Sequence, residues 1–283
     1  MTIKSLEDVD FNRIVSAFLR AFSDYDVIFS AEDIYEMCKR RGFDPALSFA
    51  AFDKDEIVAF TLNGKGSFNG KEMAYDTGTA TVKEYRGRGL AAQIFKHSIP
   101  FLKDTGITHY ILEVLQHNIP AISIYENVGF KITREFNYFS WKEGMMRNEI
   151  NNSRKQWDVR EISLPSQVEV QNFWDFNPSW QNGFESVERS RERFVSLAVY
   201  ADEMLVGYAI FEPASGDITQ LAVHPNFRRE GIASYLLSEM EKRNQSGKFK
   251  VINTETSCTS ITGFLESKGI APAGQQYEMM KEL

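Results

Sequence analysis

The sequence is poor in the features that mark secreted, membrane-spanning and metal-binding proteins. It has two cysteines among 283 residues, Cys38 and Cys258, which are too few for a thiolate zinc site or a disulfide framework. No apolar run approaches the ~18 residues that cross a bilayer, and the first residues lack the apolar h-region of a signal peptide. The four histidines are not spaced as metal ligands. We therefore expect a cytoplasmic protein with reduced thiols, no bound metal and no membrane segment.

The sequence also lacks an excess of positively charged residues. The 32 Lys and Arg residues are outnumbered by 39 Asp and Glu residues, which gives a formal net charge of −7. A nucleic-acid-binding protein would show the opposite balance, and no RNA-binding aromatic motif is present. Three short basic clusters occur: Lys39-Arg40-Arg41 is interpreted as solvent-facing, whereas Arg86-Gly87-Arg88 and Arg228-Arg229 lie close to glycines. Nucleic acid is therefore not an expected partner.

What the chain does contain is an internal repeat. The length suggests one large domain or two of ordinary size. Ala80, Arg86 and Gly89 recur 142 residues later as Ala222, Arg228 and Gly231, in the same order. A period near half the chain length predicts two similar domains in tandem rather than a solenoid. We expect the domains to cover residues 1–146 and 147–283, with the junction in the polar stretch 147–155.

Hydrophobic spacing predicts a mixed α/β order in each half. In the first half we expect helices over 11–22, 31–40, 90–102 and 118–128, and strands over 47–52, 56–62, 73–82, 108–114 and onward from 130. In the second half we expect strands over 195–200, 205–211, 217–223 and 250–254, and helices over 232–242 and 260–268. Pro100 should kink or end its helix. The glycine-rich stretch 64–70 is interpreted as a hairpin between strands.

In both halves a strand is followed by a short Arg/Gly loop and then by a helix. The first amides of a helix have no intrahelical partners, and the helix dipole adds positive potential there. Gly89 and Gly231 carry no side chain, so a ligand can approach the backbone closely. Such a loop is suited to a pyrophosphate. It is not a P-loop, because the GxxxxGK[ST] string is absent.

The combined motifs resemble the GNAT superfamily of acetyl-CoA-dependent N-acyltransferases. The first half has Arg-x-x-Gly-x-Ala at 86–91, and Asn-x-x-Ala-x-x-x-Tyr-Glu-x-x-Gly-Phe at 118–130. The resemblance covers both halves and implies an α/β (α+β) chain of two tandem GNAT domains. Each domain would be a mixed, mainly antiparallel twisted sheet flanked by helices. It also implies an N-acetyltransferase that uses acetyl-CoA and a small-molecule or peptide amine acceptor, as a monomer or homodimer.

The resemblance further implies which residues contact acetyl-CoA. The strand end holds the pantetheine arm, the loop and helix start hold the pyrophosphate, and an Asn contacts the arm. In the first half these residues are Thr79, Ala80, Thr81, Gly87, Arg88, Gly89, Leu90, Ala91, Ala92 and Asn118. Their counterparts in the second half are Leu221, Ala222, Val223, Arg229, Glu230, Gly231, Ile232, Ala233 and Ser234.

Acetyl transfer to an amine needs a group that takes the amine proton and a group that protonates the departing thiolate. The resemblance places the acid at Tyr125, whose phenol is protonated at neutral pH. Glu113 is the first candidate for the base, because a carboxylate is unexpected inside the apolar strand 110–115 and ribosomal-protein N-terminal acetyltransferases use a Glu there. Asp76, on the strand that leads to the loop, is the second candidate. A relay through ordered water, without a base, is the third possibility.

The second half keeps the loop but not these groups. Cys258, Leu265 and Asn253 stand where Asn118, Tyr125 and Glu113 stand in the first half. We therefore expect turnover in the first half. Asp217 and Glu255 stay open as bases in the second half, and mycothiol synthase is a tandem member whose carboxyl-terminal half is active. The aromatic run 173–180 is interpreted as core packing or an acceptor surface. The rival to an enzyme is a non-catalytic acyl-CoA-binding sensor.

Overall fold

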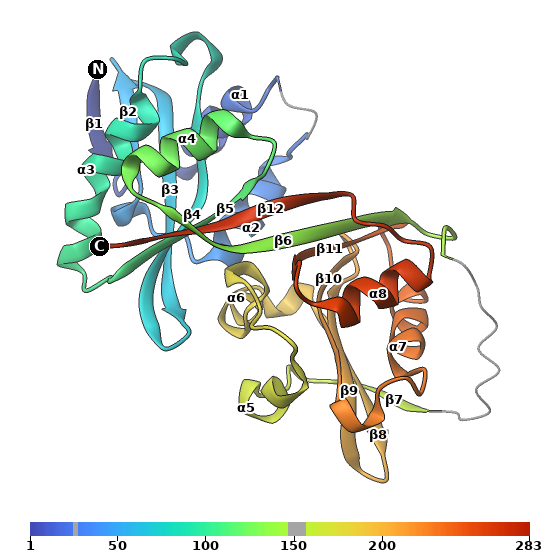
Figure 1. The fold of residues 1–283 in the computed structure, drawn as a ribbon. Helices are drawn as coiled ribbons and strands as arrows, with labels where there is room; N and C mark the ends of the chain where they lie inside the picture. Colours follow the sequence, from blue (N-terminus) through green and yellow to red (C-terminus); the bar gives the residue numbers. More distant parts are fainter. Residues whose placement is uncertain (25–27, 147–156) are drawn as a thin grey trace. The chain divides into compact units, whose positions relative to one another are not determined.

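The computed structural model describes residues 1–24, 28–146 and 157–283. The chain divides into two compact units (Figure 1). Unit 1 comprises residues 1–134 and 277–283, and unit 2 comprises residues 135–276.

Unit 1 is built on a mixed sheet in which the strand order is β1-β2-β3-β4-β5-β12-β6. The strands are β1 (Thr2–Ser5), β2 (Phe49–Asp53), β3 (Glu56–Phe68), β4 (Lys71–Thr81), β5 (His109–Leu115), β12 (Gly274–Glu282) and β6 (Lys131–Lys142). Strands β1 to β4 pair in antiparallel fashion, whereas β4 and β5 are parallel. This confirms the predicted mixed, mainly antiparallel sheet.

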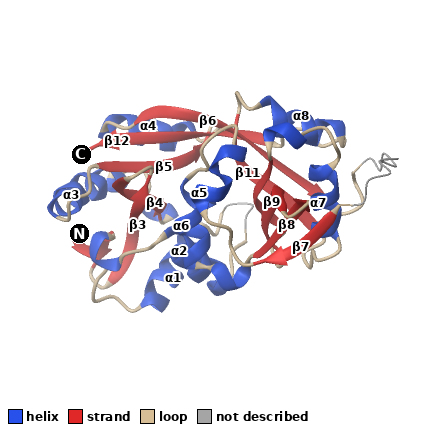
Figure 2. Ribbon diagram, turned by 90° about the horizontal axis from the view of Figure 1, so that it is seen from below, coloured by secondary structure: helices blue, strands red, loops and turns tan. Residues whose placement is uncertain are grey.

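Four helices cover the two faces of this sheet (Figure 2). They are α1 (Phe11–Ala21), α2 (Ala31–Arg41), α3 (Leu90–Asp104) and α4 (Ile119–Val128). On one face α1 and α2 pack on Phe60 and Leu62 of β3. On the other face α3 packs on Ala59, the neighbour of Phe60 in β3, as alternation along a strand requires. Burial of these apolar side chains holds the site's strands and helices in register.

Unit 2 repeats the plan. Its strands are β7 (Asp158–Ile162), β8 (Val195–Ala201), β9 (Met204–Glu212), β10 (Asp217–Val223), β11 (Lys248–Glu255) and the second part of β6. Its helices are α5 (Gln167–Val170), α6 (Phe184–Arg189), α7 (Ile232–Glu241) and α8 (Thr259–Ser267). Helices α7 and α8 bury Leu236 and Leu265 in one core cluster, and α5 and α6 bury Val170 and Val187 in another.

The two units do not simply follow one another along the chain, because the last residues of the chain return to unit 1. Strand β6 begins in unit 1 and ends in unit 2, where it pairs with β11 from Phe136 to Lys142. Strand β12 begins in unit 2, and its residues from Tyr277 onward belong to unit 1. There Glu278, which is 2% exposed, accepts hydrogen bonds from Thr133 and Arg134. The predicted boundary between 146 and 147 thus lies inside unit 2, and the predicted junction at 147–155 lies outside the described residues.

Two local expectations changed. Helix α3 does not end at Pro100 but continues to Asp104, and Pro100 lies on its exposed side. Strand β3 continues through the glycine-rich stretch to Phe68, so the hairpin turn is confined to Asn69 and Gly70. Both residues have positive φ angles, 51° and 73°, which favour Asn and Gly.

Candidate active site

The loop before α3 leaves helix amides open to solvent. Gly87 and Gly89 have φ angles of 77° and 70°, which residues with a Cβ adopt only with strain. Gly89 is the N-cap of α3, and no side chain caps the helix. Both glycines are exposed. The first amides of α3 are therefore available to an anion, as the sequence predicted for a pyrophosphate site.

The arginines of this loop bind within the protein. Arg86 donates to both carboxylate oxygens of Asp24 at 2.7 Å, and to the backbone oxygens of Ala21 at 2.9 Å and Thr81 at 3.1 Å. The hydrogen bond from Arg86 lowers the pKa of Asp24. Arg86 thus ties the end of β4 to the end of α1. No sequence pattern pointed to Asp24 as the partner of Arg86. Arg88 donates to the Glu84 carbonyl at 3.0 Å.

Strands β4 and β5 pair only briefly and then separate. Their parallel register runs from Met73 to Tyr75, and β4 continues to Thr81 with β3 as its partner. Opposite Leu62 and Asn63 the β3–β4 register shifts, so that Thr77 is the extra residue of a bulge. Beyond the bulge, β4 has no further register pair with β5 among the described residues. The predicted contacts Thr79, Ala80 and Thr81 lie in this part of β4.

Asp76 and Tyr125 meet beside this opening. The Tyr125 hydroxyl, from α4, lies beside the Asp76 carboxylate and lowers its pKa. The Thr79 hydroxyl lies 2.9 and 3.0 Å from the two Asp76 oxygens and donates to them. Burial raises the pKa of Asp76 from 3.8 to about 7, against the lowering effects of these hydrogen bonds, of the Gly78 amide and of the Arg41 charge. A carboxyl group with this pKa is suited to accept a proton near neutral pH.

Glu113 faces a different neighbour. Its half-buried carboxylate lies near the buried Tyr75 hydroxyl. Burial and the Glu113 charge raise the pKa of Tyr75 well above 10, so this phenol stays protonated. The structure therefore brings two of the three predicted catalytic residues, Asp76 and Tyr125, next to each other, and places Glu113 near Tyr75.

The Asn118 side chain caps α4, because its Oδ1 atom accepts a hydrogen bond from the Ala121 amide at 3.3 Å. Gly129 ends the helix with a φ of 101°, as the sequence predicted. These two residues fix the length and direction of α4, which carries Tyr125.

Unit 2 has a loop of the same kind. Gly231 caps α7 with a φ of 88° and without a side-chain cap. Arg228 donates to the Val223 and Phe173 carbonyls and to Asp175, at 3.1, 3.0 and 2.8 Å. These contacts match those of Arg86. The two motif arginines therefore fasten the loop to the body of each unit, a role that the repeat alone did not reveal.

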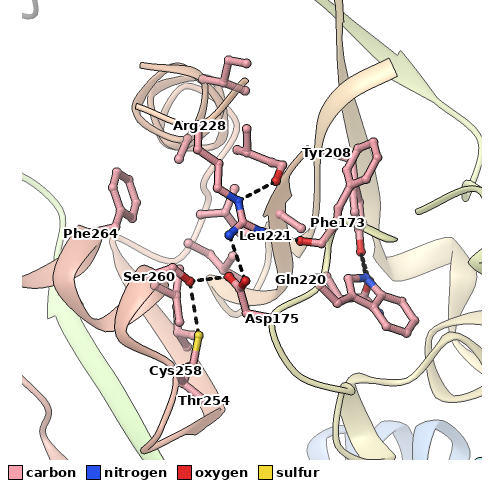
Figure 3. A pocket seen from close by; sticks show the side chains of 18 of the residues that line it. Phe173, Asp175, Tyr208, Gln220, Leu221, Arg228, Thr254, Cys258, Ser260 and Phe264 are labelled. Atoms are coloured by element: carbon pink, nitrogen blue, oxygen red, sulfur yellow. Dashed lines mark hydrogen bonds and ion pairs between the residues drawn. The ribbon is translucent and has the colours of Figure 1, made fainter. Parts of the chain in front are cut away.

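A pocket of about 420 Å³ lies where β10 and β11 separate in unit 2 (Figure 3). β10 and β11 have one register pair, Asp217 with Lys250, and the shift between Ile218 and Gln220 makes Thr219 the extra residue of a bulge. The wall contains every residue predicted as a coenzyme contact in this half except Glu230. They are Leu221, Ala222, Val223, Arg229, Gly231, Ile232, Ala233 and Ser234.

The Tyr125 phenol has no equivalent at the matching position of this pocket, but Tyr208 of β9 contributes a phenol to the wall. Leu265, at the Tyr125 position, is buried in the core, and Cys258 is the N-cap of α8. Cys258 contacts the Ser260 hydroxyl at 3.3 Å, which donates to Asp175 at 2.5 Å (Figure 3). Trp174 donates to Tyr208, which donates to Gln220, at 2.6 and 2.7 Å. The aromatic run thus contributes pocket wall as well as core.

Among residues 1–24, 28–146 and 157–283, no group of three or more His, Cys, Asp or Glu side chains is arranged to hold a metal ion. Within the same ranges no helix is both long and apolar enough to cross a membrane.

Comparison with known sequences adds the family. A model described as "Acetyltransferase (GNAT) family" matches residues 12–130, and one described as "Acetyltransferase (GNAT) domain" matches residues 192–269. The chain belongs to the GNAT family. Proteins of this family use acetyl-CoA. The two matches confirm the prediction of two GNAT domains in tandem.

Individual relatives match only part of this chain or share a low sequence identity with it. The chain is 32% identical over 97 residues to N-alpha-acetyltransferase 30 of Schizosaccharomyces pombe, a match that covers 34% of this chain and 65% of that protein. A GCN5-related N-acetyltransferase from Sphaerobacter thermophilus has a similar fold, with a TM-score of 0.70 at 14% identity over 99% of this chain and 95% of that one. A tandem GNAT protein from the clavulanic acid biosynthesis pathway gives 0.69 at 12% identity, over 99% and 98%. The chain thus spans less than two thirds of the length of the fission-yeast relative.

Proposed function

We propose that unit 1 of this GNAT protein transfers an acetyl group from acetyl-CoA to an amine in a ternary complex. The observation that carries the proposal is the buried Asp76 carboxylate, held by the Thr79 hydroxyl and with the Tyr125 phenol near it, beside the separated strands β4 and β5. A buried carboxylate and a phenol at this place supply both proton transfers that the reaction needs. A binding module that only senses acyl-CoA has no use for this pair, so it is the weaker candidate.

Acetyl-CoA would lie along the free edge of β4 and reach the start of α3. Its pyrophosphate would accept hydrogen bonds from the amides of the loop and of the first turn of α3. Its pantetheine arm would bind the β4 backbone between the strands and the Asn118 amide. The proposed contacts are those predicted from the sequence: Thr79, Ala80, Thr81, Gly87, Arg88, Gly89, Leu90, Ala91, Ala92 and Asn118.

The reaction can then be written with its protons balanced. Asp76 accepts a proton from the amine, and the amine nitrogen attacks the thioester carbonyl. The C–N bond forms, the C–S bond breaks, and Tyr125 protonates the departing thiolate. Because Tyr125 lies beside Asp76, the phenol would recover its proton from the carboxyl group. The amine proton thus ends on the thiol of coenzyme A.

A covalent enzyme intermediate is not part of this proposal. The cysteine of unit 1, Cys38, is buried in the core formed by α1, α2 and β3, and burial raises its pKa to about 12. Only a thiolate is an effective nucleophile, so Cys38 is unsuited to acyl transfer. We expect initial-rate measurements at several concentrations of both substrates to give intersecting lines. Parallel lines would indicate a covalent intermediate.

We further propose that the acceptor is the amino terminus of a peptide, because the fission-yeast relative is named an N-alpha-acetyltransferase. The test compares a peptide that has a free amino terminus and an internal lysine with the same peptide blocked at the amino terminus. We expect acetylation of the first peptide only, measured by mass spectrometry. Equal acetylation of both would assign the lysine as acceptor, and turnover of small amines alone would remove peptides from the proposal while leaving the chemistry intact.

For unit 2 we propose coenzyme A binding without turnover. The predicted contacts at the α7 loop line its pocket, but Leu265 stands at the Tyr125 position and cannot protonate a thiolate. Asp217 is fully buried, and Glu255 ends β11. Neither is within the pocket wall. Unit 2 would then contribute stability that depends on the ligand.

A matched pair of variants tests this division. Gly89 and Gly231 each cap a helix at a positive φ, so valine imposes the same kind of backbone strain at both. We expect Gly89→Val to reduce turnover at least about tenfold and to weaken the rise in melting temperature caused by acetyl-CoA. Gly231→Val should keep most of the activity. Circular dichroism must first show that both variants fold, and activity lost only in Gly231→Val would place the active site in unit 2.

A further inference from the structure

Backbone hydrogen bonds and a close backbone contact hold the carboxyl-terminal end of helix α2 against strand β3. Gly42, the residue after the helix, accepts a hydrogen bond from the Lys65 amide at 2.9 Å, and the Asp44 amide donates to the Asn63 carbonyl at 2.8 Å. A Cβ atom at Gly64 would lie 2.1 Å from the Arg41 carbonyl oxygen. Only glycine at position 64 permits this approach, so the helix end is fixed against β3.

From this end the Arg41 side chain crosses β3 to β4. Its Nη1 atom donates to the Thr77 carbonyl at 2.8 Å, and Thr77 is the extra residue of the bulge. Its guanidinium carbon lies 5.9 Å from the centre of the Tyr75 ring, within the range of a cation–π contact. The residues on either side of Asp76 in β4 are therefore both in contact with one guanidinium group.

The surroundings of Asp76 make this charge important. The polar groups that face it come from its own strand (Thr79 and the Gly78 amide), from α4 (Tyr125), from β5 (Tyr110) and from α2 (Arg41). Glu113 of β5 acts on the neighbouring Tyr75. Arg41 is the positive charge of this set. It lowers the pKa values of Asp76 and Tyr75, which burial raises.

We propose that Arg41 is a positioning residue of the unit 1 active site, which holds the β4 bulge through the Thr77 carbonyl and offsets the burial of the Asp76 carboxylate. This rests on the proposed function, in which Asp76 is the base. Arg41 does not touch the reacting atoms. Lys39-Arg40-Arg41 was expected to face solvent, but only the tertiary structure shows that Arg41 reaches across a strand.

The decisive measurement is the pH dependence of kcat/KM for Arg41→Gln. The Arg41 charge lowers the pKa of Asp76, so its loss should move the acidic limb toward higher pH. A shift of about one pH unit would lower the rate at pH 7 about fivefold, because the ionised fraction of a carboxyl group with a pKa of about 7 would fall from about one half to about one tenth. Part of the loss should be recovered at higher pH. KM for acetyl-CoA should change less than kcat, because the proposed pyrophosphate contacts at the α3 loop do not involve Arg41.

Two variants serve as controls. Arg41→Lys keeps the charge, so its acidic limb should stay near that of the natural protein even where kcat falls. Arg20→Gln removes an arginine of α1 that pairs with exposed Glu56 at 2.7 Å, and it should leave the limb unchanged. Should Arg41→Gln fail to fold, Arg41→Met retains an apolar stem against the Tyr75 ring, and the same limb is measured.

The outcomes separate the two proposals. A folded, uncharged Arg41 variant whose acidic limb does not move overturns the role of Arg41. If the acidic limb moves equally in Arg20→Gln, the role of Arg41 is also overturned, because loss of a positive charge elsewhere in unit 1 would then have the same effect. A limb that persists in Asp76→Asn overturns Asp76 as the base, whatever the Arg41 variants show.

Discussion

Replacing Asp76 with asparagine should lower kcat/KM at pH 7 by about 100- to 10,000-fold, the range for loss of a general base. Asparagine keeps an oxygen that accepts the hydrogen bond from Thr79 but cannot accept the amine proton. In the natural protein the rate should rise with pH through about 7, because Asp76 must be ionised to act and burial raises its pKa to that value. The acidic limb should disappear in the variant. The measurement is the pH–rate profile under conditions of low substrate.

Glu113→Gln is the matched comparison, since it also converts a carboxylate to an amide on a neighbouring strand. We expect its acidic limb to survive. If the limb is lost in Glu113→Gln and retained in Asp76→Asn, Glu113 is the base, as the sequence first suggested. If both variants retain it, a water relay without a carboxylate base is the better mechanism.

The melting temperature of Asp76→Asn shows whether its loss of rate comes from the missing base or from misfolding. The folded-state pKa of Asp76 lies above its value of about 4 in an unfolded chain, so its ionisation favours unfolding. The stability that this group contributes is complete below pH 4 and is lost as the pH rises from about 4 to about 7. At pH 8 the asparagine variant should therefore melt no lower than the natural protein. A large drop in melting temperature would mean that the loss of rate reflects misfolding.

Tyr125→Phe should lower kcat by about 100- to 10,000-fold while acetyl-CoA binding changes little. Phenylalanine retains the ring, which packs edge-on against Phe95, but cannot protonate the thiolate. The Tyr125 hydroxyl, which lowers the pKa of Asp76, is also lost, so the remaining acidic limb should move to higher pH. The measurements are kcat, the pH profile and the acetyl-CoA dissociation constant.

The control for Tyr125→Phe is Tyr85→Phe, which removes a hydroxyl that donates to Asp53 at 2.8 Å outside the proposed site. This variant should keep nearly full activity. A thioester with a better leaving group should also restore part of the activity of Tyr125→Phe, since a less basic thiolate needs no acid. Unchanged kcat in Tyr125→Phe would remove the phenol from the mechanism and leave thiolate protonation to solvent.

Much of the local structure could be predicted from the sequence, because its determinants are close along the chain. Asn118 and Gly129 bound α4 at the predicted ends, since a cap needs only the residues beside it. Gly89 and Gly231 begin α3 and α7 at positive φ, as a glycine before each helix indicated. The repeat of Arg86 and Gly89 predicted two domains of one family, which the family matches confirm.

The tertiary structure decided what depends on contacts between distant segments. The sequence could not show that residues 277–283 belong to unit 1, because strand pairing leaves no periodic trace of its partner. It named Asp76 and Tyr125 separately, but only packing of α4 beside β4 joins them, and only burial brings the pKa of Asp76 to about 7. Arg86 forms a hydrogen bond with Asp24, and Arg41 with Thr77, at sequence separations of 62 and 36 residues. Residue types and spacing thus determined the family and the local elements, whereas desolvation and long-range hydrogen bonds, which exist only in the folded chain, determined the chemistry of the site.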